Sequence, residues 1–487
     1  MRFARPAVAP WGVLLWVAAT QLGCGARAIP IIGTIPDGGE PPTPCPSTLA
    51  ARLSVTDILV DKDIAWQKSG YDQFPADERV ALAVQPNGQA LIAWTEVNPT
   101  KAADGSQQLP MGVHVTPLDA NFARRGADAI LSTAQEVSGL VAHDDGFALL
   151  TRDLNPGTKI DLGDGATVAF LVRYQNGQQS YRVPLTGSAS GDAAETFTLY
   201  SPFLEGQLAW DGTAYGAYFV VEGGQGDSRQ GYWRDALVFR DAFLGPAPWT
   251  VAHGCENNGG LRLINDSGKV NLVGATWANI PAMTGLCIQQ SRESVKLTAM
   301  EADRLVSDQE VQWSGYSGAR MGSLLKIPGG YLVFWLSLGA SIDQNGHDIR
   351  MARLDSNFQL VSGPNWLLPR TPGREEWNLH VVPYGPTQFL MVYGEIANIN
   401  SPLGDDAVYL GDYVGTHLAL IDLDGNVIAD EIVNNAATTA NAEPVVLPNG
   451  DVAWPFVNPS PDYTQRIYGV NGPGQTALHV AHLRYCK

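Results

Sequence analysis

Positive charge and charged residues in general are scarce in this chain of 487 residues. Lysine and arginine number 31 against 49 aspartates and glutamates, which gives a net charge of −18 at pH 7. That balance disfavours a nucleic acid or an anionic lipid surface as the partner, because both bind basic proteins. Charged residues make up only 16% of the chain, which is too few for a helical bundle.

Long hydrophobic runs are also missing, since the apolar run of residues 11–19 is too short for an ordinary membrane-spanning helix. Arg2 and Arg5 precede the run and small residues follow it, which is the pattern of a targeting segment. The sequence therefore predicts a signal peptide over residues 1–23.

The end of that segment, Gln21-Leu22-Gly23-Cys24, resembles the lipobox of bacterial lipoproteins. The resemblance implies cleavage before Cys24 and its acylation, and Gly25 after it implies the outer membrane. Gln21 stands where the family prefers leucine, and a plain signal peptide cut nearby is the alternative. Residues 24–46, rich in proline and glycine, are expected to form a tether, so that the protein is an exported lipoprotein, periplasmic or exposed at the cell surface.

Glycine, proline and tryptophan are abundant, with 52, 32 and 13 residues, as expected for short strands joined by tight turns. A hairpin recurs through residues 47–487, for example at Val80–Trp94 and Val445–Trp454, and each copy is read as two strands around a two-residue turn. The turns of successive copies are 56 to 66 residues apart. They begin at Asn87, Asp145, Asp211, Ser267, Gly329, Gly385 and Asn449.

Seven hairpins of this length, each followed by two further strands, predict an all-β, seven-bladed β-propeller. The last unit stops after three strands, and Leu49–Val60 can supply its fourth strand, so the last blade is closed by the N-terminal strand. Kelch, WD and quinoprotein signatures are all missing, so no particular propeller family is recognised.

Four cysteines remain besides Cys24, and in an exported chain they favour two disulfide bonds. Cys45 and Cys486 flank the strands that close the last blade, which predicts a bond between them. Cys255 and Cys287 belong to two loops of the fourth blade and are expected to form the second bond. A zinc site is the alternative, but no Cys-x-x-Cys pair occurs.

The loops after the second and fourth strands are long and fall at one end of the sheets, which we call the loop face. One of them is predicted over Ala278–Glu293. Three second strands end there in carboxylates, at Glu96, Glu222 and Glu395, and these are the candidate catalytic residues. Solvated strand ends are the alternative reading. A binding role at the same channel mouth is predicted for Arg79, Arg262, Arg320, Glu376, Trp377 and His380.

Other polar groups suggest a cation site or packing. Asp343, Asn345 and Asp348 offer alternating oxygen ligands for calcium, although such clusters also form plain turns. His114, His417 and His479 occupy the same third-strand position in three blades, which indicates a repeated packing arrangement rather than a shared metal site. Trp94, Trp335 and Trp454 are expected in the core between blades.

Two functions remain open from the sequence. The first is a cell-envelope lipoprotein whose loop face binds a glycan, peptide or protein partner. The alternative is a carbohydrate-active enzyme, either a glycoside hydrolase or a polysaccharide lyase, that uses the carboxylates of the loop face.

Overall fold

The computed structural model describes two units separately, Met1–Cys45 and Pro46–Lys487. The described residues are 45–64, 80–97, 110–154, 167–185, 206–210, 214–222, 233–241, 250–253, 258–265, 283–289, 294–301, 304–312, 320–337, 346–357, 359–368, 371–400, 410–438, 442–459, 461, 463–464 and 475–486. These residues form β-strands and a single 3-10 turn, η1 (Ala50–Arg52). Within them, no helix has the length and apolarity needed to cross a bilayer.

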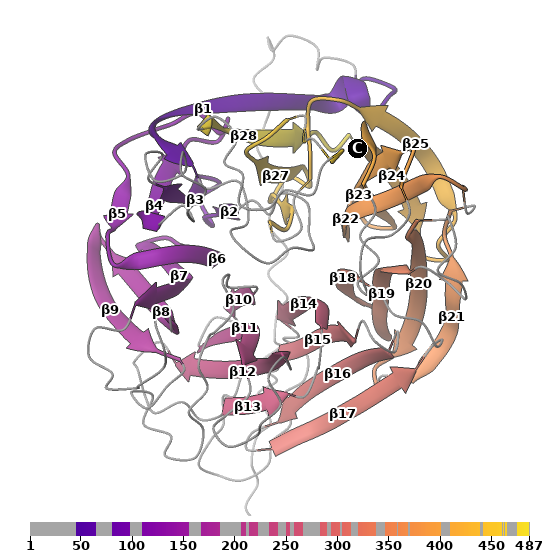
Figure 1. Ribbon diagram of the computed structural model, residues 1–487, viewed down its shortest axis with the longest axis horizontal. Helices are drawn as coiled ribbons and strands as arrows, with labels where there is room; N and C mark the ends of the chain where they lie inside the picture. Colours follow the sequence, from indigo (N-terminus) through magenta and orange to yellow (C-terminus); the bar gives the residue numbers. More distant parts are fainter. Residues whose placement is uncertain are drawn as a thin grey trace, which may run out of the picture. The chain divides into compact units, whose positions relative to one another are not determined.

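Five sheets have four strands in sequence order, each strand antiparallel to the next. The chain has the β-propeller fold: these sheets lie around a common centre, with their first strands innermost and their fourth strands at the periphery (Figure 1). The first sheet consists of β6 (Ala134–His143), β7 (Gly146–Leu154), β8 (Thr167–Gln175) and β9 (Gln178–Pro184), and the second of β10 (Gly206–Trp210), β11 (Ala214–Glu222), β12 (Trp233–Asp241) and β13 (Thr250–His253). The third consists of β14 (Asn258–Asn265), β15 (Met283–Gln289), β16 (Ser294–Glu301) and β17 (Arg304–Gln312), and the fourth of β18 (Arg320–Ile327), β19 (Gly330–Ser337), β20 (Asp348–Asp355) and β21 (Leu360–Trp366). The fifth consists of β22 (Arg374–Pro383), β23 (Gln388–Ala397), β24 (Asp412–Asp422) and β25 (Val427–Val433).

The sixth sheet has eight strands and brings the two ends of the propeller unit together. Its strands are β26 (Val445–Val446), β27 (Val452–Phe456), β28 (Gln475–Leu483), β1 (Leu53–Ile64), β2 (Val80–Val84), β3 (Ala90–Val97), β4 (Pro110–Leu118) and β5 (Ala129–Leu131). β1 pairs with β28 from Leu53 opposite Leu483 onwards. A single pair, Ile64 opposite Glu96, links β1 to β3. The sheet thus consists of two four-stranded groups with one link between them.

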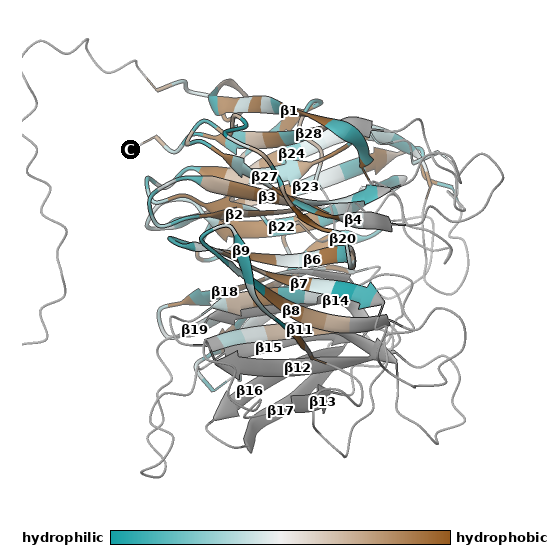
Figure 2. Cartoon of the chain, turned by 90° about the vertical axis from the view of Figure 1, so that its left-hand side faces the viewer, coloured by the Kyte–Doolittle hydropathy of each residue, from teal (hydrophilic) through white to brown (hydrophobic). Residues whose placement is uncertain are grey.

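The core lies between neighbouring sheets. Figure 2 shows apolar residues along the described strands and hydrophilic ones at their turns. Between β18–β21 and β22–β25, for example, Phe334 and Met351 pack against Val381 and Met391. Every residue of β19 is buried, because the strand has a neighbouring sheet on both faces. Trp94, Trp335 and Trp454 are at most 1% exposed, which confirms their predicted place in the core.

The predicted hairpins at Asn87 and Asn449 are confirmed, but their turns differ from the two-residue form. Gly88 has a φ of 83° and Gly450 a φ of 91°, while neither asparagine has a positive φ. Gly88 N donates to Gln85 O and Gln85 N to Gln89 O, so each loop is a type I turn closed by a glycine bulge. Only the glycine therefore has to adopt the left-handed conformation.

The hairpin predicted at Ser267 is wrong in its second strand. β14 pairs with Met283–Gln289, with Arg262 opposite Leu286, and not across a two-residue turn at Ser267. Residues 266–282 lie outside the described part of the chain. Part of the loop expected over Ala278–Glu293 is therefore a strand. A serine-glycine pair is a weak turn signal that longer-range strand pairing can override.

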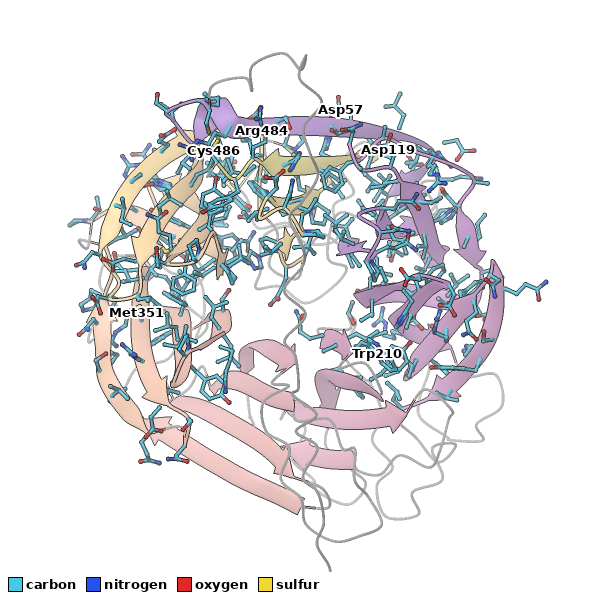
Figure 3. All side chains as sticks on the ribbon, turned by 180° about the vertical axis from the view of Figure 1, so that it is seen from behind. Asp57, Asp119, Trp210, Met351, Arg484 and Cys486 are labelled. Carbon is cyan, nitrogen blue, oxygen red and sulfur yellow. The ribbon has the colours of Figure 1, made fainter. Side chains whose placement is uncertain are left out.

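The N-terminal strand is fastened by covalent and polar contacts. Cys45 and Cys486 are disulfide-bonded, which confirms that prediction, and Cys486 lies beside the start of β1 near Arg484 (Figure 3). The Glu431 carboxylate of β25 accepts hydrogen bonds from Leu49 N at 2.9 Å and from Ala50 N at 2.8 Å. Glu431 thus ties η1 to the sheet that precedes β26–β28.

Replacing Glu431 tests that tie. Glu431→Ala leaves two backbone N–H groups without their charged acceptor, so we expect the free energy of unfolding to fall by about 1 to 3 kcal/mol. Equilibrium unfolding in urea measures the change. Asp61→Ala is the matched control, because it removes an exposed carboxylate from β1 and is expected to change stability by less than about 0.5 kcal/mol. Equal effects of the two variants would contradict the assignment.

Candidate functional site

Two carboxylates face each other at the loop face of the sheet β22–β25. The antiparallel register sets Glu376 of β22 directly opposite Glu395 of β23. Residues paired in this way project to the same side of a sheet. The ion pair between Glu395 and Arg374, two residues before Glu376, places these three side chains on that one side. Successive residues of a strand point to opposite sides, so Tyr393 lies on the same side of β23 as Glu395. Tyr393 belongs to the core shared with Phe334 and Leu336 of β19, so this side packs toward the sheet β18–β21.

Glu395 is compensated by a cation at each of its oxygens. Arg374 Nη1 binds Oε1, and His417 Nε2 on β24 lies 3.2 Å from Oε2. His417 Nδ1 in turn lies 2.8 Å from Asp430 Oδ1, and its ring stacks on Tyr393 with centroids 4.5 Å apart. Both ring nitrogens face carboxylates, which favours the doubly protonated imidazolium.

The pKa values of this group follow from these contacts. Burial on its own raises the pKa of Glu395, but hydrogen bonding and charge from His417 and the Arg374 guanidinium hold it below the ordinary value. Burial on its own lowers the pKa of His417, but its bonds to Asp430 and Glu395 raise it to about 9. Glu395 is therefore ionised and His417 protonated at neutral pH.

Glu376 is in the opposite situation. Its side chain is 5% exposed, and its Oε2 atom has no hydrogen-bond partner among the described residues. Burial raises its pKa well above the ordinary value, and the nearby charges of Asp348, Glu375 and Glu395 raise it further. Glu375 itself is fully buried and lies 2.7 Å from His347 Nδ1. Glu376 therefore holds its proton more tightly than Glu395, whose pKa is lowered.

Glu96 occupies the matching position in β3 but has different surroundings. Its Oε2 lies 2.8 Å from His114 Nε2 on β4, and His114 Nδ1 lies 3.3 Å from Asp128. Trp94 stacks on the His114 ring with centroids 4.1 Å apart. Within the part of the chain that the structure describes, β2 begins at Val80, opposite Trp94, so no second carboxylate lies across from Glu96.

The same arrangement of an aromatic residue opposite a basic one recurs around the propeller. Phe456 faces and stacks on His479, which lies 2.8 Å from Asp57 of β1. In another sheet Trp335 faces Arg350. This confirms that the three predicted histidines are a repeated packing arrangement. For His417 the prediction was incomplete, because its ring also holds Glu395.

One sheet reverses the roles, a variation that sequence reasoning missed. Phe170 stands at the histidine position of β8 and Arg182 of β9 lies over its ring at 3.5 Å. Arg182 also pairs with Asp153 at 2.7 Å. Burial raises the pKa of Asp153 to about 6, although hydrogen bonds from Thr151 and Arg182 and the charges of Arg182 and Arg152 act to lower it. The sequence signal that could have revealed this group is Asp153, an acid near the end of the apolar strand β7.

The remaining predicted binding residues do not gather at one point. Trp377 lies on the other side of β22, where it packs with Ile396 and Tyr463. His380 is 1% exposed and follows a bulge in the β22 register. Only the backbone is described for Glu222, Arg262 and Arg320, and Arg79 lies outside the described residues.

Several other predictions also fall partly outside the described residues. Cys24, Cys255, Asp343 and Asn345 lie there, and of Cys287 only the backbone in β15 is described. Asp348 begins β20 and is 3% exposed. Among the described residues, no group of three or more histidine, cysteine, aspartate or glutamate side chains is placed to hold a metal ion.

Sequence comparison gives no relative, since no family model matches the chain and no curated protein matches it. Many solved structures resemble it, among them the following three. A protein of unknown function from Dyadobacter fermentans has 12% identity and a TM-score of 0.40, over 88% of this chain and 99% of its own. The periplasmic gluconolactonase of Pseudomonas aeruginosa has 13% identity and a TM-score of 0.37, over 78% and 99%.

The third is the α-L-arabinanase of Penicillium chrysogenum in complex with arabinobiose, with 9% identity and a TM-score of 0.39, over 87% of this chain and 98% of its own. Likenesses this distant do not bear on the chemistry of the chain. The function has to be inferred from the side chains that the strands bring together.

The raised pKa of His417 makes stability depend on pH. A folded-state pKa of about 9 against an ordinary value near 6.5 gives stability that is fully present below about pH 6.5 and is lost as pH rises through about 9. We expect wild type to lose about 2 to 3 kcal/mol more than His417→Gln between about pH 7 and about pH 10.

Urea unfolding at the two pH values measures that loss. His143→Gln is the control, because burial and Arg173 lower the pKa of His143 to about 4, and it is therefore neutral throughout this range. A His417→Gln protein that follows wild type at both pH values would contradict the assignment.

Proposed function

We propose that this protein is a carbohydrate-active enzyme that hydrolyses a glycosidic bond between Glu376 and Glu395. One observation carries the proposal: two carboxyl groups face each other across neighbouring strands, and among the residues that the structure describes only Glu395 is compensated by cations. Glycoside hydrolysis requires such a pair, with one acid that protonates the leaving oxygen and one carboxylate that acts at the sugar. Surroundings that push the two pKa values apart assign these roles.

Glu376 is the proton donor in this proposal. Its buried carboxyl, whose Oε2 has no hydrogen-bond partner among the described residues, keeps its proton because its pKa is raised and delivers that proton to the departing oxygen. Glu395 is the ionised partner, and its side chain keeps 14% exposure, while that of Arg374 is 37% exposed. The pair therefore reaches solvent from the Glu395 side, where a sugar ring can approach.

The proposal extends to the blade count and the closure. The five four-stranded sheets and the two groups of the eight-stranded sheet correspond to seven blades. Pairing of β1 with β28 supports closure of the last blade by the N-terminal strand. A closed propeller leaves the first strands around one channel, so the ends of β22 and β23 at the loop face adjoin its mouth.

Export and anchoring form part of the same proposal. The basic and apolar start of the chain and the lipobox-like end before Cys24 support a signal peptide and a lipid anchor in the outer membrane. An envelope enzyme held by a tether would meet polysaccharide outside the cytoplasm, with its loop face as the working face.

Substitution of the two carboxylates tests the reaction. Glu376→Gln and Glu395→Gln are each expected to lower kcat/KM by about 10²- to 10⁴-fold, measured on a polysaccharide panel by reducing-end release and on aryl glycosides. Glu376→Gln should lose least on aryl glycosides with an acidic phenol leaving group, which needs no proton. Glu96→Gln is the matched control, because it breaks the same carboxylate-histidine contact in β3, and it should stay within about threefold of wild type.

The outcomes of this test are distinct. Wild type that cleaves nothing would overturn the enzyme proposal, and wild type that binds a glycan without cleaving it would favour a binding protein. Activity unchanged in both Glu376→Gln and Glu395→Gln would place the reaction elsewhere. Circular dichroism and thermal unfolding verify that the variants are folded.

A bell-shaped pH profile is the second prediction. Activity should fall on the acid side when Glu395 takes up a proton, below its ordinary range because its pKa is lowered. It should fall on the alkaline side when Glu376 loses its proton, well above the ordinary carboxyl range, because burial and the charges of Asp348, Glu375 and Glu395 raise its pKa. kcat/KM between about pH 3 and about pH 10 measures both limbs, and an alkaline limb that persists in Glu376→Gln would contradict the assignment.

A further inference from the structure

The geometry of the Glu376 and Glu395 pair also bears on the stereochemistry of the reaction. Retaining enzymes have their two carboxyl groups about 5 to 5.5 Å apart, while inverting enzymes hold them about 6.5 to 9.5 Å apart to admit a water molecule. Residues directly opposite on antiparallel strands have Cβ atoms about 4.5 to 5.5 Å apart. Glu376 and Glu395 are such a pair, and their side chains leave the same side of the sheet next to each other, so their backbone positions allow the shorter separation of the carboxyl groups.

Two anchors keep Glu395 from turning away from its partner. Arg374 holds Oε1 from β22, and His417 holds Oε2 from β24, at 3.2 Å. β23 lies between these strands, so the carboxylate is fastened from both sides and stays above its own strand. His417 is itself fixed by Asp430 at 2.8 Å and by stacking on Tyr393.

Burial of Glu376 restricts the movement of the second carboxyl group. Glu376 is enclosed, at 5% exposure, beside Asp348 at 3% and Glu375 at 0%, so its side chain has little room to move outward. A carboxylate has four lone-pair sites. Arg374 and His417 occupy one site on each oxygen of Glu395, which leaves a lone pair on each for a reaction.

From this arrangement we infer that the hydrolysis retains anomeric configuration and that Glu395 is the nucleophile. The inference rests on the proposed function. In the first step a Glu395 oxygen forms a bond to the anomeric carbon, the glycosidic C–O bond breaks, and the leaving oxygen takes the proton of Glu376. In the second step water attacks the anomeric carbon, gives a proton to Glu376, and the ester bond to Glu395 breaks. Both carboxyl groups return to their initial states.

Proton NMR of the first-formed product tests the stereochemistry. The wild-type protein is incubated in D₂O with a glycoside that the panel shows to be cleaved, and the anomeric signal is recorded before mutarotation. The configuration of the substrate is the expected result. An inverted product would overturn the inference while leaving the hydrolysis proposal intact, and failure to cleave any glycoside would instead overturn the proposed function.

Trapping the intermediate tests the nucleophile. A 2-deoxy-2-fluoro glycoside with a good leaving group, of the same sugar, slows release of the ester, so a retaining enzyme accumulates it. Intact mass spectrometry should show one added fluorosugar, and peptide mapping should locate it on Glu395. Glu96→Gln should be labelled like wild type and Glu395→Gln should not be labelled, although it is folded. No label in wild type, or a label on another residue, would overturn the assignment of Glu395.

Discussion

Packing of each sheet against its two neighbours is the constraint on which the rest of this structure depends. A four-stranded antiparallel sheet cannot bury both of its faces alone, and here the apolar side chains of one sheet meet those of the next. The inner strands are consequently buried on both faces, as in β19. Polar chemistry is left to the ends of the strands, where the loops begin.

Charges at those ends are only partly exposed, so they need compensation. At three sites a histidine on the third strand of a four-stranded group lies under an aromatic residue and bonds an aspartate from the next strand or the segment just before it. At a fourth site the base is Arg182, on the outer strand, and the acid is Asp153. The arrangement tolerates changes of residue because it keeps one positive and at least one negative group together.

Glu376 is the exception to this compensation. The charges that raise its pKa are those of acids, and its buried Oε2 has no hydrogen-bond partner among the residues that the structure describes. Keeping a carboxyl protonated in this way costs stability relative to a solvated carboxylate, and a cost of that kind is found where a protein needs a proton donor. The contrast with Glu395, which has two cations, gives the pair opposite charge states within one sheet.

The sequence predicted much of this without the structure. Asn-Gly turns and alternating strands revealed the hairpins at Asn87 and Asn449, and the position of Cys45 before a closing strand predicted its bond to Cys486. Glu395 was a catalytic candidate because it ends a second strand, whereas Glu376 was predicted only as a binding residue near it at the channel mouth. Ser267 misled, because a local turn signal has no information on which distant segment will pair with β14.

The sequence by itself determined the strand pattern, the apolar residues of the core and the residue types at the strand ends, because these depend on local alternation and turn chemistry. Only the tertiary structure decided which acids meet. Register across the β22 bulge set Glu376 opposite Glu395, and packing brought Asp348 from another sheet beside it. The charge of a carboxyl depends on neighbours distant in sequence, so the difference between Glu96, which has Lys62 and His114 beside it and Ile64 opposite it, and the pair at β22 and β23 exists only in the fold.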